Sequence, residues 1–298
     1  MNDRGLALPP ALRFIPVGAI RAHEVPEAGR AAGLRGRIGA EGVLRNPVAV
    51  AELAPGEYLL VDGTHRYESL RAGGYGYALA QVAPLTAPTV VDTWSHAARV
   101  DADRFLDEVA AAGLAALPAE LDAAEEAVAR RRAPFAFALR DRPDAAFVAD
   151  GRGDKARALR AFVGLYRPWR VTNDEILARG GFDPARLFAD GDFADANLLV
   201  RFAAFSPDEI VAQVRNGARI PAGITRFVLG GGRVLGVDVP VRLLAPAASD
   251  AEQGAWLAQL ARRRPRRFAG PVRVRETRPR HYAEPLLVYD PDLTVEPA

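Results

Sequence analysis

The ten residues V-D-G-T-H-R-Y-E-S-L, Val61 to Leu70, place a strand, a turn and a helix in a short space. They close the apolar run Tyr58 to Val61, which is short and apolar enough to be a buried strand. The chain then turns at Asp62-Gly63, and a helical spacing of apolar residues runs on to Gly73-Gly74. The stretch therefore predicts a strand that delivers a glycine turn to the start of a helix.

Such a turn is suited to binding an anion. The first N–H groups of a helix have no intrahelical partner, and the aligned peptide dipoles place partial positive charge there, which favours phosphate. Asp62 adds a possible metal or ammonium ligand, His65 a titratable donor and Arg66 a fixed cation. An ordinary strand-turn-helix, with Asp62 holding the turn and the other two side chains in solvent, explains the same residues equally well.

Four sequence blocks in a fixed order favour the functional interpretation. They are I-x-x-H-E from Ile20 to Glu24, Leu34 with Ile38, G-V-L-R-N-P from Gly42 to Pro47, and D-G-T-H-R-Y from Asp62 to Tyr67. Together they resemble the ParB/sulfiredoxin superfamily between Ile15 and Leu85, and most of all its free serine kinase branch. That branch makes O-phospho-L-serine from serine and a nucleotide. The resemblance therefore implies an enzyme, a nucleotide-dependent serine kinase that phosphorylates an alcohol.

The resemblance also implies roles for residues in these blocks. Glu24 would be the general base that accepts the proton of the serine hydroxyl. Asp62 would bind Mg²⁺ or orient the substrate, and Asn46 would face the nucleotide. From the residues alone, Glu24 is a solvated carboxylate ahead of a helix and Asn46 is a turn residue before proline. The phosphates would be held by backbone donors and a cation at the helix start: Gly63, Thr64, His65 and Arg66.

A second group of residues is expected to contact the serine. The segment Arg219 to Phe227 is similar to an I/P-P-x-x-T segment in the second domain of the serine-kinase-like proteins. Trp94 and His96 lie where two units are expected to meet, and clefts tend to form at such places. Each candidate also has an ordinary explanation, as a core aromatic or as an exposed strand residue. The substrate candidates are His23, Trp94, His96, Gly223, Thr225, Arg226 and His281.

The order of short helical and strand patterns predicts a mixed α/β (α+β) fold. The chain is long enough for two ordinary domains. We expect residues 1–98 to form a ParB/sulfiredoxin-like, nucleotide-binding catalytic domain. Residues 99–298 would form a larger mixed α/β domain that binds the substrate and closes over it, with a cleft between the two.

Three local patterns in the second half give specific expectations. The run Pro134 to Leu139 alternates like a strand and is expected to pair with Ala145 to Val148 as a hairpin. Ser206 to Glu209 combines a cap, a first-turn proline and a glutamate, which predicts the start of a helix. Gly230 to Gly232 lies between two alternating runs, so a hairpin turn explains it better than a phosphate loop.

Composition narrows the possible chemistry and location. The chain has no cysteine, which excludes thiolate metal sites and cysteine nucleophiles. Of its 39 basic residues only Lys155 is a lysine, and with a formal net charge of +2 the arginines indicate coding bias rather than a nucleic-acid surface. The dense run Arg262 to Arg267 is expected to be a solvated face. No signal peptide or membrane-length apolar run is present, so we expect a cytoplasmic protein with no membrane partner.

A ParB-like DNA-binding or nucleotide-dependent regulator is the main alternative function. The partition proteins carry a glycine-glutamate-arginine-arginine block where this chain has Asp62 to Arg66, and they append a helix-turn-helix. Thr172 to Phe188 can be interpreted as such a motif, but it lacks an arginine-rich recognition face, so packing explains it better. Sulfiredoxin-like repair is excluded, because Thr64 stands where that branch has its cysteine.

The resemblance leaves the phosphate donor and the pathway open. Thr64 replaces the first of two histidines in the archaeal-type kinases, so no contact of that histidine is carried over. The family includes ATP and ADP users. We favour ATP, because the second half looks more like the bacterial members associated with siderophore or diaminopropionate biosynthesis. Phosphoserine could equally supply cysteine biosynthesis.

Overall fold

The chain forms two compact units. The structure, a computed structural model, describes residues 11–87, 89–142, 146–149, 154–172, 183–189, 193, 195–275 and 279–297. Unit 1 comprises residues 1–90, 207–222 and 227–298, and unit 2 comprises residues 91–206 and 223–226. This division differs from the expected boundary at residue 98, because most of the chain after Ser206 returns to unit 1. The assignment of a catalytic domain and a substrate-binding domain stays a prediction.

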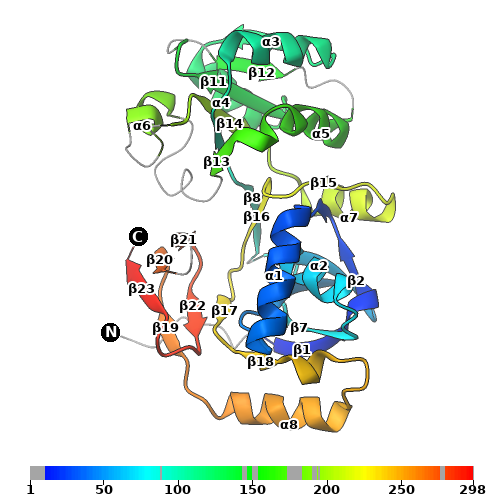
Figure 1. Ribbon diagram of the computed structural model, residues 1–298. Helices are drawn as coiled ribbons and strands as arrows, with labels where there is room; N and C mark the ends of the chain where they lie inside the picture. Colours follow the sequence, from blue (N-terminus) through cyan, green and yellow to red (C-terminus); the bar gives the residue numbers. More distant parts are fainter. Residues whose placement is uncertain are drawn as a thin grey trace. The chain divides into compact units, whose positions relative to one another are not determined.

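Unit 1 is built on a five-stranded mixed sheet (Figure 1). The strand order is β1-β7-β5-β6-β2. Neighbours are parallel where β7 meets β5 and where β6 meets β2, and antiparallel elsewhere. The strands are β1 (Ala11–Pro16), β7 (Tyr77–Val82), β5 (Val48–Ala54), β6 (Glu57–Asp62) and β2 (Ile20–Ala22). A sheet of this mixed type, with its helices, confirms the expected fold class.

Two helices carry the residues of interest in unit 1. Helix α1 (Ala28–Glu41) ends at Gly42, whose φ of 69° lets the chain leave the helix in a left-handed conformation. Helix α2 (Thr64–Ala72) lies against α1, and the Ser69 hydroxyl donates a 2.8 Å hydrogen bond to the Ala31 carbonyl.

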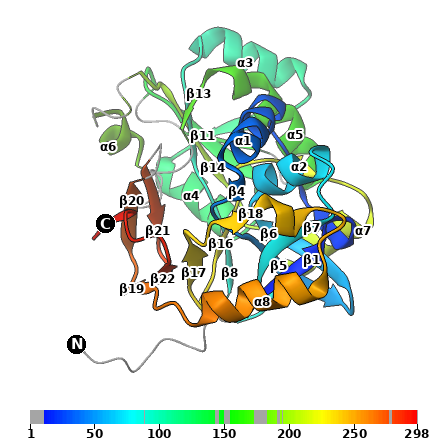
Figure 2. The same cartoon turned by 60° about the horizontal axis from the view of Figure 1, so that its bottom comes forward.

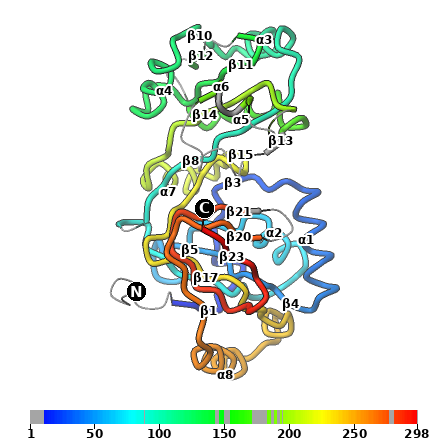
Figure 3. Tube along the Cα trace, turned by 90° about the vertical axis from the view of Figure 1, so that its left-hand side faces the viewer, coloured from blue at the N-terminus to red at the C-terminus, as the bar shows by residue number. Residues whose placement is uncertain are grey.

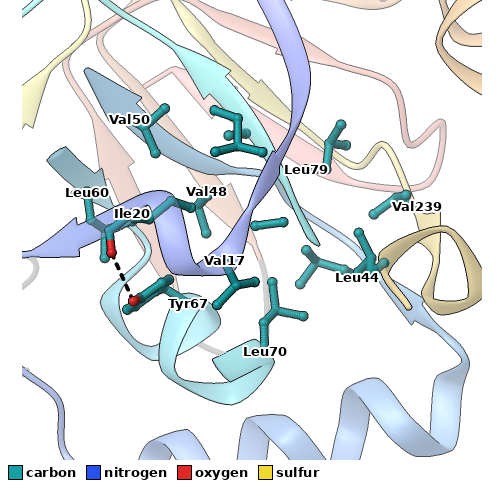
Figure 4. Close-up of a cluster of buried hydrophobic side chains, with 14 of the residues drawn as sticks. Val17, Ile20, Leu44, Val48, Val50, Leu60, Tyr67, Leu70, Leu79 and Val239 are labelled. Atoms are coloured by element: carbon teal, nitrogen blue, oxygen red, sulfur yellow. Dashed lines mark hydrogen bonds between the residues drawn. The ribbon is translucent and has the colours of Figure 1, made fainter. Parts of the chain in front are cut away.

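The core of unit 1 lies between the sheet and its helices (Figure 4). It includes fully buried side chains of β5 and β6, such as Val48 and Leu60, together with Leu70 of α2. Helix α8 (Asp250–Ala261) lies next to β1 in unit 1 (Figure 2). It adds Trp256, whose ring meets that of Phe14 edge-on at 5.9 Å. Residues near both ends of the chain therefore share one core.

The C-terminal part of unit 1 adds two three-stranded sheets (Figure 3). One has the order β17-β22-β19 and the other β21-β20-β23. The first consists of β17 (Arg233–Leu235), β22 (Leu286–Val288) and β19 (Arg266–Phe268). The second consists of β21 (Pro279–Tyr282), β20 (Val272–Arg275) and β23 (Thr294–Pro297). Smaller elements are the pairs β3 (Glu24–Val25) with β15 (Ile220–Pro221) and β4 (Val43–Leu44) with β18 (Val239–Pro240), the helix α7 (Pro207–Arg215), and the 3₁₀ turns Val17–Ala19 and Val241–Leu244.

Unit 2 is an antiparallel six-stranded sheet with the order β10-β12-β11-β14-β9-β13. Its strands are β10 (Ala116–Ala119), β12 (Ala146–Ala149), β11 (Phe135–Leu139), β14 (Leu198–Phe202), β9 (His96–Ala98) and β13 (Arg170–Thr172). Its helices are α3 (Ala102–Ala111), α4 (Leu121–Ala129), α5 (Lys155–Tyr166) and α6 (Pro184–Ala189), with a 3₁₀ turn at Arg167–Trp169. Strands β8 (Val90–Thr93) and β16 (Thr225–Val228) form a two-stranded sheet.

Alternation along β11 explains how this sheet is covered on both faces. Phe135 and Phe137 point one way, and their rings contact Phe162 of α5. Ala136 and Ala138 point the other way, into a cluster with residues of α4. Aromatic rings therefore fill the face toward α5, and small alanine side chains face α4. The predicted pairing of this strand with Ala146–Ala149 is confirmed.

The hairpin expected around Gly230 to Gly232 is wrong. The chain does turn there, with the Gly232 N–H bonded to the Leu229 carbonyl at 2.8 Å. However, β16 pairs with β8, while β17 pairs in parallel with β22. The carboxamide of Gln81 holds β17 in place, since it donates to the Gly232 carbonyl at 2.7 Å and accepts from the Val234 N–H at 3.0 Å. Two strands joined by a glycine turn therefore enter different sheets.

Other expectations can be compared only in part. The helix predicted after Ser206 is confirmed as α7. Residues 173–182, which include most of the possible helix-turn-helix and its capping signal, lie outside the described residues. Within the described ranges, no helix is long and apolar enough to cross a bilayer.

A buried hydrogen bond of α2 gives a first test of the packing in unit 1. The Tyr67 hydroxyl donates to the Ile20 carbonyl at 3.0 Å (Figure 4). Replacing Tyr67 by phenylalanine removes the donor of this buried hydrogen bond, so the free energy of unfolding should fall by about 0.5–1.5 kcal/mol. Urea unfolding measures this change. Tyr75→Phe is the control, since its hydroxyl makes no hydrogen bond within the described part of the chain, and equal losses in both variants would refute the explanation.

Candidate active site

The turn after β6 has the predicted conformation. Strand β6 ends at Asp62, and α2 starts at Thr64, as expected. Gly63 between them has a φ of 96°, and a Cβ there would lie 2.8 Å from Arg66 Nε and 3.1 Å from Val48 Cγ1. Both the backbone conformation and the space require glycine at this position. The first N–H groups of α2, which have no partner within the helix, therefore follow directly after the turn.

Glu24 lies against this turn. It is buried, at 7% exposure, in β3, which runs parallel to β15. The Thr64 hydroxyl donates a 3.0 Å hydrogen bond to Glu24 Oε2. This contact joins the two segments that the sequence placed 40 residues apart. Thr64 is therefore a hydrogen-bond donor to the proposed general base.

His23 is packed behind Glu24. Its Nδ1 lies 2.9 Å from the Leu60 carbonyl, so this nitrogen carries the proton and donates. The other ring nitrogen, Nε2, is 3.9 Å from Glu24 Oε1. Burial lowers the pKa of His23, although Glu24 and the carbonyl contact oppose that effect. His23 is thus a neutral buried ring beside the carboxylate.

Asp62 is held by two arginines. Its Oδ2 accepts from Arg66 Nη2 at 2.7 Å and from Arg233 Nη1 at 2.5 Å. Burial alone would raise the pKa of Asp62, but the charges of Arg233 and Arg66 outweigh it and bring the pKa well below its usual range. Arg66 therefore neutralises Asp62 and folds back over Gly63. Its predicted contact with a phosphate stays a prediction.

Sequence reasoning missed the residues behind Asp62. Arg233 of β17 is 11% exposed and donates through Nε to Glu284 Oε1 at 2.7 Å. Burial opposes the charge of Arg233, but Asp62 and Glu284 raise its pKa above its usual value. The sequence held only a weak signal for this pair. Arg233 and Glu284 each stand at or near the start of an apolar strand, where a buried charge needs a partner.

His65 and Asn46 make contacts that fix the loops near the turn. His65 Nε2 accepts the backbone N–H of Glu27 at 3.2 Å, so the start of α2 holds the start of α1. Asn46 Oδ1 accepts the Gly236 N–H at 2.7 Å. The first bond brings the two helix starts together, and the second joins the loop before β5 to the end of β17. The nucleotide contacts expected of His65 and Asn46 stay predictions.

Five of the predicted substrate residues come together in unit 2. The Arg226 guanidinium stacks over the Trp94 ring at 4.7 Å, and the Trp94 N–H donates to the Ile224 carbonyl. Gly223, with a φ of 85°, bends the chain beside Thr225, which is 7% exposed. His96 Nε2 donates to the Gly223 carbonyl at 2.8 Å, and its Nδ1 accepts from the Tyr166 hydroxyl at 2.8 Å. His96 therefore supports the segment from inside unit 2.

His281 lies on another part of unit 1. It pairs with Arg273 across β21 and β20. Its neighbour Tyr282 faces Arg233, whose guanidinium is 5.4 Å from the ring centre. Successive side chains of a strand point to opposite faces, so His281 points away from Arg233 and Asp62. Its predicted substrate contact gains no support from this position.

The neutral state of His96 predicts a pH effect on stability. Burial, aided by Arg170, lowers its pKa from 6.5 to about 3. Between these values the unfolded chain binds a proton that the folded chain does not, so the free energy of unfolding decreases as pH falls. The expected slope from this group is up to about 1.4 kcal/mol per pH unit. Urea unfolding at several pH values between about 7 and 5 should show a flatter dependence for His96→Gln, whereas identical slopes would contradict the assignment.

The metal prediction is only partly supported by the donor set. Among the described residues no group of three His, Asp or Glu side chains could hold a metal ion. Mg²⁺ commonly binds through one or two carboxylates together with the phosphates of a nucleotide. The Asp62 carboxylate, which is ionised and 39% exposed, fits that mode through an oxygen not used by the arginines. A dedicated protein cage is absent from the described part of the chain.

Comparisons with known proteins support the interpretation of the sequence blocks. No protein-family model matches the chain. The ATP-dependent L-serine kinase SbnI of Staphylococcus aureus is 26% identical over 236 residues, which is 78% of this chain and 84% of SbnI. The structure of C-terminally truncated SbnI from the same organism matches with a TM-score of 0.64 at 24% identity, over 84% of this chain and 95% of that one.

Free serine kinase structures match equally well. A mutant in complex with AMP gives a TM-score of 0.63 at 20% identity and covers 82% of this chain and 97% of that one. A mutant in complex with ADP gives 0.62 at 20% identity over the same shares. The chain has the free serine kinase fold. The resemblance expected from the four sequence blocks is confirmed, and within this fold Glu24, Thr64 and Asp62 lie around the start of α2.

Proposed function

We propose that this protein is a free L-serine kinase, which transfers a phosphate from ATP (or ADP) to the serine hydroxyl and forms O-phospho-L-serine. The observation that carries the proposal is the 3.0 Å contact between Thr64 and Glu24, which places a buried carboxylate beside a helix start on the free serine kinase fold. The similarity to an ATP-dependent L-serine kinase over most of both chains supports ATP as the donor.

In this proposal Glu24 accepts the proton of the serine hydroxyl while that oxygen bonds to the terminal phosphorus. The bond from phosphorus to the nucleotide oxygen breaks, and ADP leaves when ATP is the donor. Backbone N–H groups from Gly63 to His65 face the phosphates and offset their charge. The ionised Asp62 would hold Mg²⁺, which neutralises phosphate charge when it is bound. Phosphoryl transfer needs positioning and charge neutralisation, and these groups supply both.

The contribution of unit 2 is part of the proposal. The Arg226 guanidinium lies over the Trp94 ring, and an arginine can bind a carboxylate through two parallel hydrogen bonds. We therefore keep Arg226 as the proposed partner of the serine carboxylate. His96 and Gly223 would hold this segment in shape rather than touch the substrate.

One experiment tests the proposal directly. Purified protein is incubated with L-serine, Mg²⁺ and either ATP or ADP, and O-phosphoserine and the nucleotide products are quantified by mass spectrometry. The expected result is phosphoserine formed in equal amount to the nucleotide product. D-Serine and serine-free reactions are the controls. Nucleotide consumption without phosphoserine, in the presence of either donor, would overturn the proposal.

A further inference from the structure

A buried ionic cluster lies directly behind the turn that starts α2. At its centre is the Arg233 guanidinium, which donates through Nη1 to Asp62 and through Nε to Glu284. Arg233 is 11% exposed and the Glu284 side chain 2%. The partners are distant in the chain, since 171 residues separate Asp62 from Arg233 and 51 separate Arg233 from Glu284.

The surroundings leave the Arg233 guanidinium little freedom. Its third nitrogen, Nη2, donates to the Phe227 carbonyl at 3.1 Å, and the Tyr282 ring lies 5.4 Å from the guanidinium carbon. The strand that carries it is anchored on both sides, by β22 and by the Gln81 carboxamide. A guanidinium is planar and its donors have a fixed arrangement, so three bonds in three directions define its orientation.

This orientation is transmitted to Asp62. Arg233 and Arg66 both donate to the same carboxylate oxygen, Oδ2, from different elements. Two donors on one oxygen fix the rotation of the carboxylate about its own axis, and with it the direction of the other oxygen. Glu284 in turn fixes Arg233 from the opposite side. Arg233, in the segment Gly232 to Leu235, thus contacts the D-G-T-H-R turn that lies 171 residues earlier in the chain.

Stability alone gives a poor account of this cluster. Buried ion pairs often contribute no more to stability than apolar residues of the same volume would, because charges lose their hydration. In some proteins a buried polar or ionic cluster instead fixes one arrangement of the groups it joins. Here the fixed group is the carboxylate that lies beside the proposed phosphate site.

We propose that Arg233, held by Glu284, is a positioning residue for the phosphoryl-transfer site and acts by fixing the Asp62 carboxylate. This inference rests on the proposed function. Arg233 need not touch the substrate or the nucleotide, and its effect passes through Asp62. Its removal should therefore reduce the rate of the chemical step more than the binding of serine.

The test uses a variant designed to fold. Arg233→Met alone would leave Glu284 buried and unpaired, so the double variant Arg233→Met with Glu284→Gln is compared with the wild type. Arg263→Met is the matched control. Arg263 also lies in unit 1, where it donates to the Tyr289 carbonyl and stacks on the Tyr289 ring. Among its described contacts none is with the turn that starts α2. Circular dichroism and thermal unfolding establish that each variant is folded.

The expected result separates positioning from packing. In the double variant kcat should fall by about 10²-fold, which is the loss expected when a catalytic group is displaced by about 1 Å. KM for serine should stay within about threefold of the wild-type value. Replacing Arg233 by lysine in the Glu284→Gln background should restore part of kcat, because the ammonium can still bond Asp62. Arg263→Met should retain wild-type kcat. A double variant with wild-type kcat, or one whose loss is confined to KM, would overturn the inference.

A failure of the proposed function is distinguishable from a failure of this inference. If the wild type forms no phosphoserine, the kinase proposal fails, and the inference is then judged by calorimetric titration with ADP and Mg²⁺. Fixing Asp62 then predicts at least tenfold weaker ADP binding in the double variant than in Arg263→Met, and equal affinities would overturn it.

Discussion

Replacing Glu24 by glutamine should lower the rate of phosphoserine formation by about 10²–10⁴-fold and leave the fold intact. Glutamine has the same shape, and its amide oxygen can still accept the Thr64 hydroxyl, as Glu24 Oε2 does at 3.0 Å. An amide cannot take a proton from an alcohol. The substitution therefore removes only the ability to accept a proton and keeps the hydrogen bond from Thr64. Initial rates with saturating serine and ATP, followed by mass spectrometry of phosphoserine, measure the effect.

Two further variants make this result specific. Glu41→Gln is the control, since Glu41 ends α1 at the surface and pairs only with Arg45 among the described residues. Its rate should equal that of the wild type. Glu24→Ala also removes the acceptor of the buried Thr64 hydroxyl, and it should cost about 1–3 kcal/mol of stability as well as activity. A Glu24→Gln enzyme that works within a few fold of the wild type would show that another group accepts the proton.

The structure favours Glu24 over Asp62 as the proton acceptor. Asp62 bonds two guanidinium groups, which hold its pKa well below its usual range, so it is a weak base. Glu24 instead faces a hydroxyl and a histidine that burial keeps neutral. Two carboxylates in such different surroundings suit two different tasks. These surroundings support the proposal that Glu24 accepts the proton and that Asp62 takes part in charge neutralisation.

The parts of this site that the sequence predicts are those with local causes. The apolar run before Asp62, the glycine with its positive φ and the helical spacing after it lie within ten residues, and the strand, turn and helix were predicted correctly. The approach of Glu24 to Thr64 has no local cause. It was expected because four sequence blocks resembled one family, not because any spacing required it.

The parts that could not be predicted depend on strand pairing between distant segments. Arg233 reaches Asp62 because β17 joins β22 in parallel, whereas the glycine turn before it looked like the middle of a hairpin. A glycine turn has the same local sequence whether the next strand folds back or enters another sheet. In the same way, His96 was proposed as a substrate contact because it lies where two units were expected to meet. Only the structure shows both of its ring nitrogens engaged inside unit 2.

The aromatic cluster under the unit 2 sheet should be the most sensitive part of that unit to truncation. Phe162 of α5 is fully buried and stacks on Phe135 at 3.8 Å, with the rings of Phe137, Phe105 and Tyr166 within 5.8 Å. Phe162→Ala removes a ring that touches four others and leaves a cavity that rigid aromatic neighbours fill poorly. We expect the free energy of unfolding to fall by about 3–5 kcal/mol, as measured by urea unfolding.

The position of Phe162 also determines where the damage should appear. Tyr166, one turn further along α5, donates its hydroxyl to His96, and His96 holds the Gly223 carbonyl. Hydrogen exchange read by mass spectrometry should therefore show the loss of protection first in α5, β9 and β11, with less change in β5 and β6 of unit 1. Trp169→Ala is the control, since this side chain is 54% exposed and its removal should change stability by no more than about 0.5 kcal/mol. Equal losses from both substitutions would mean that the rings do not form the core of unit 2, because only a buried side chain leaves a cavity when it is removed.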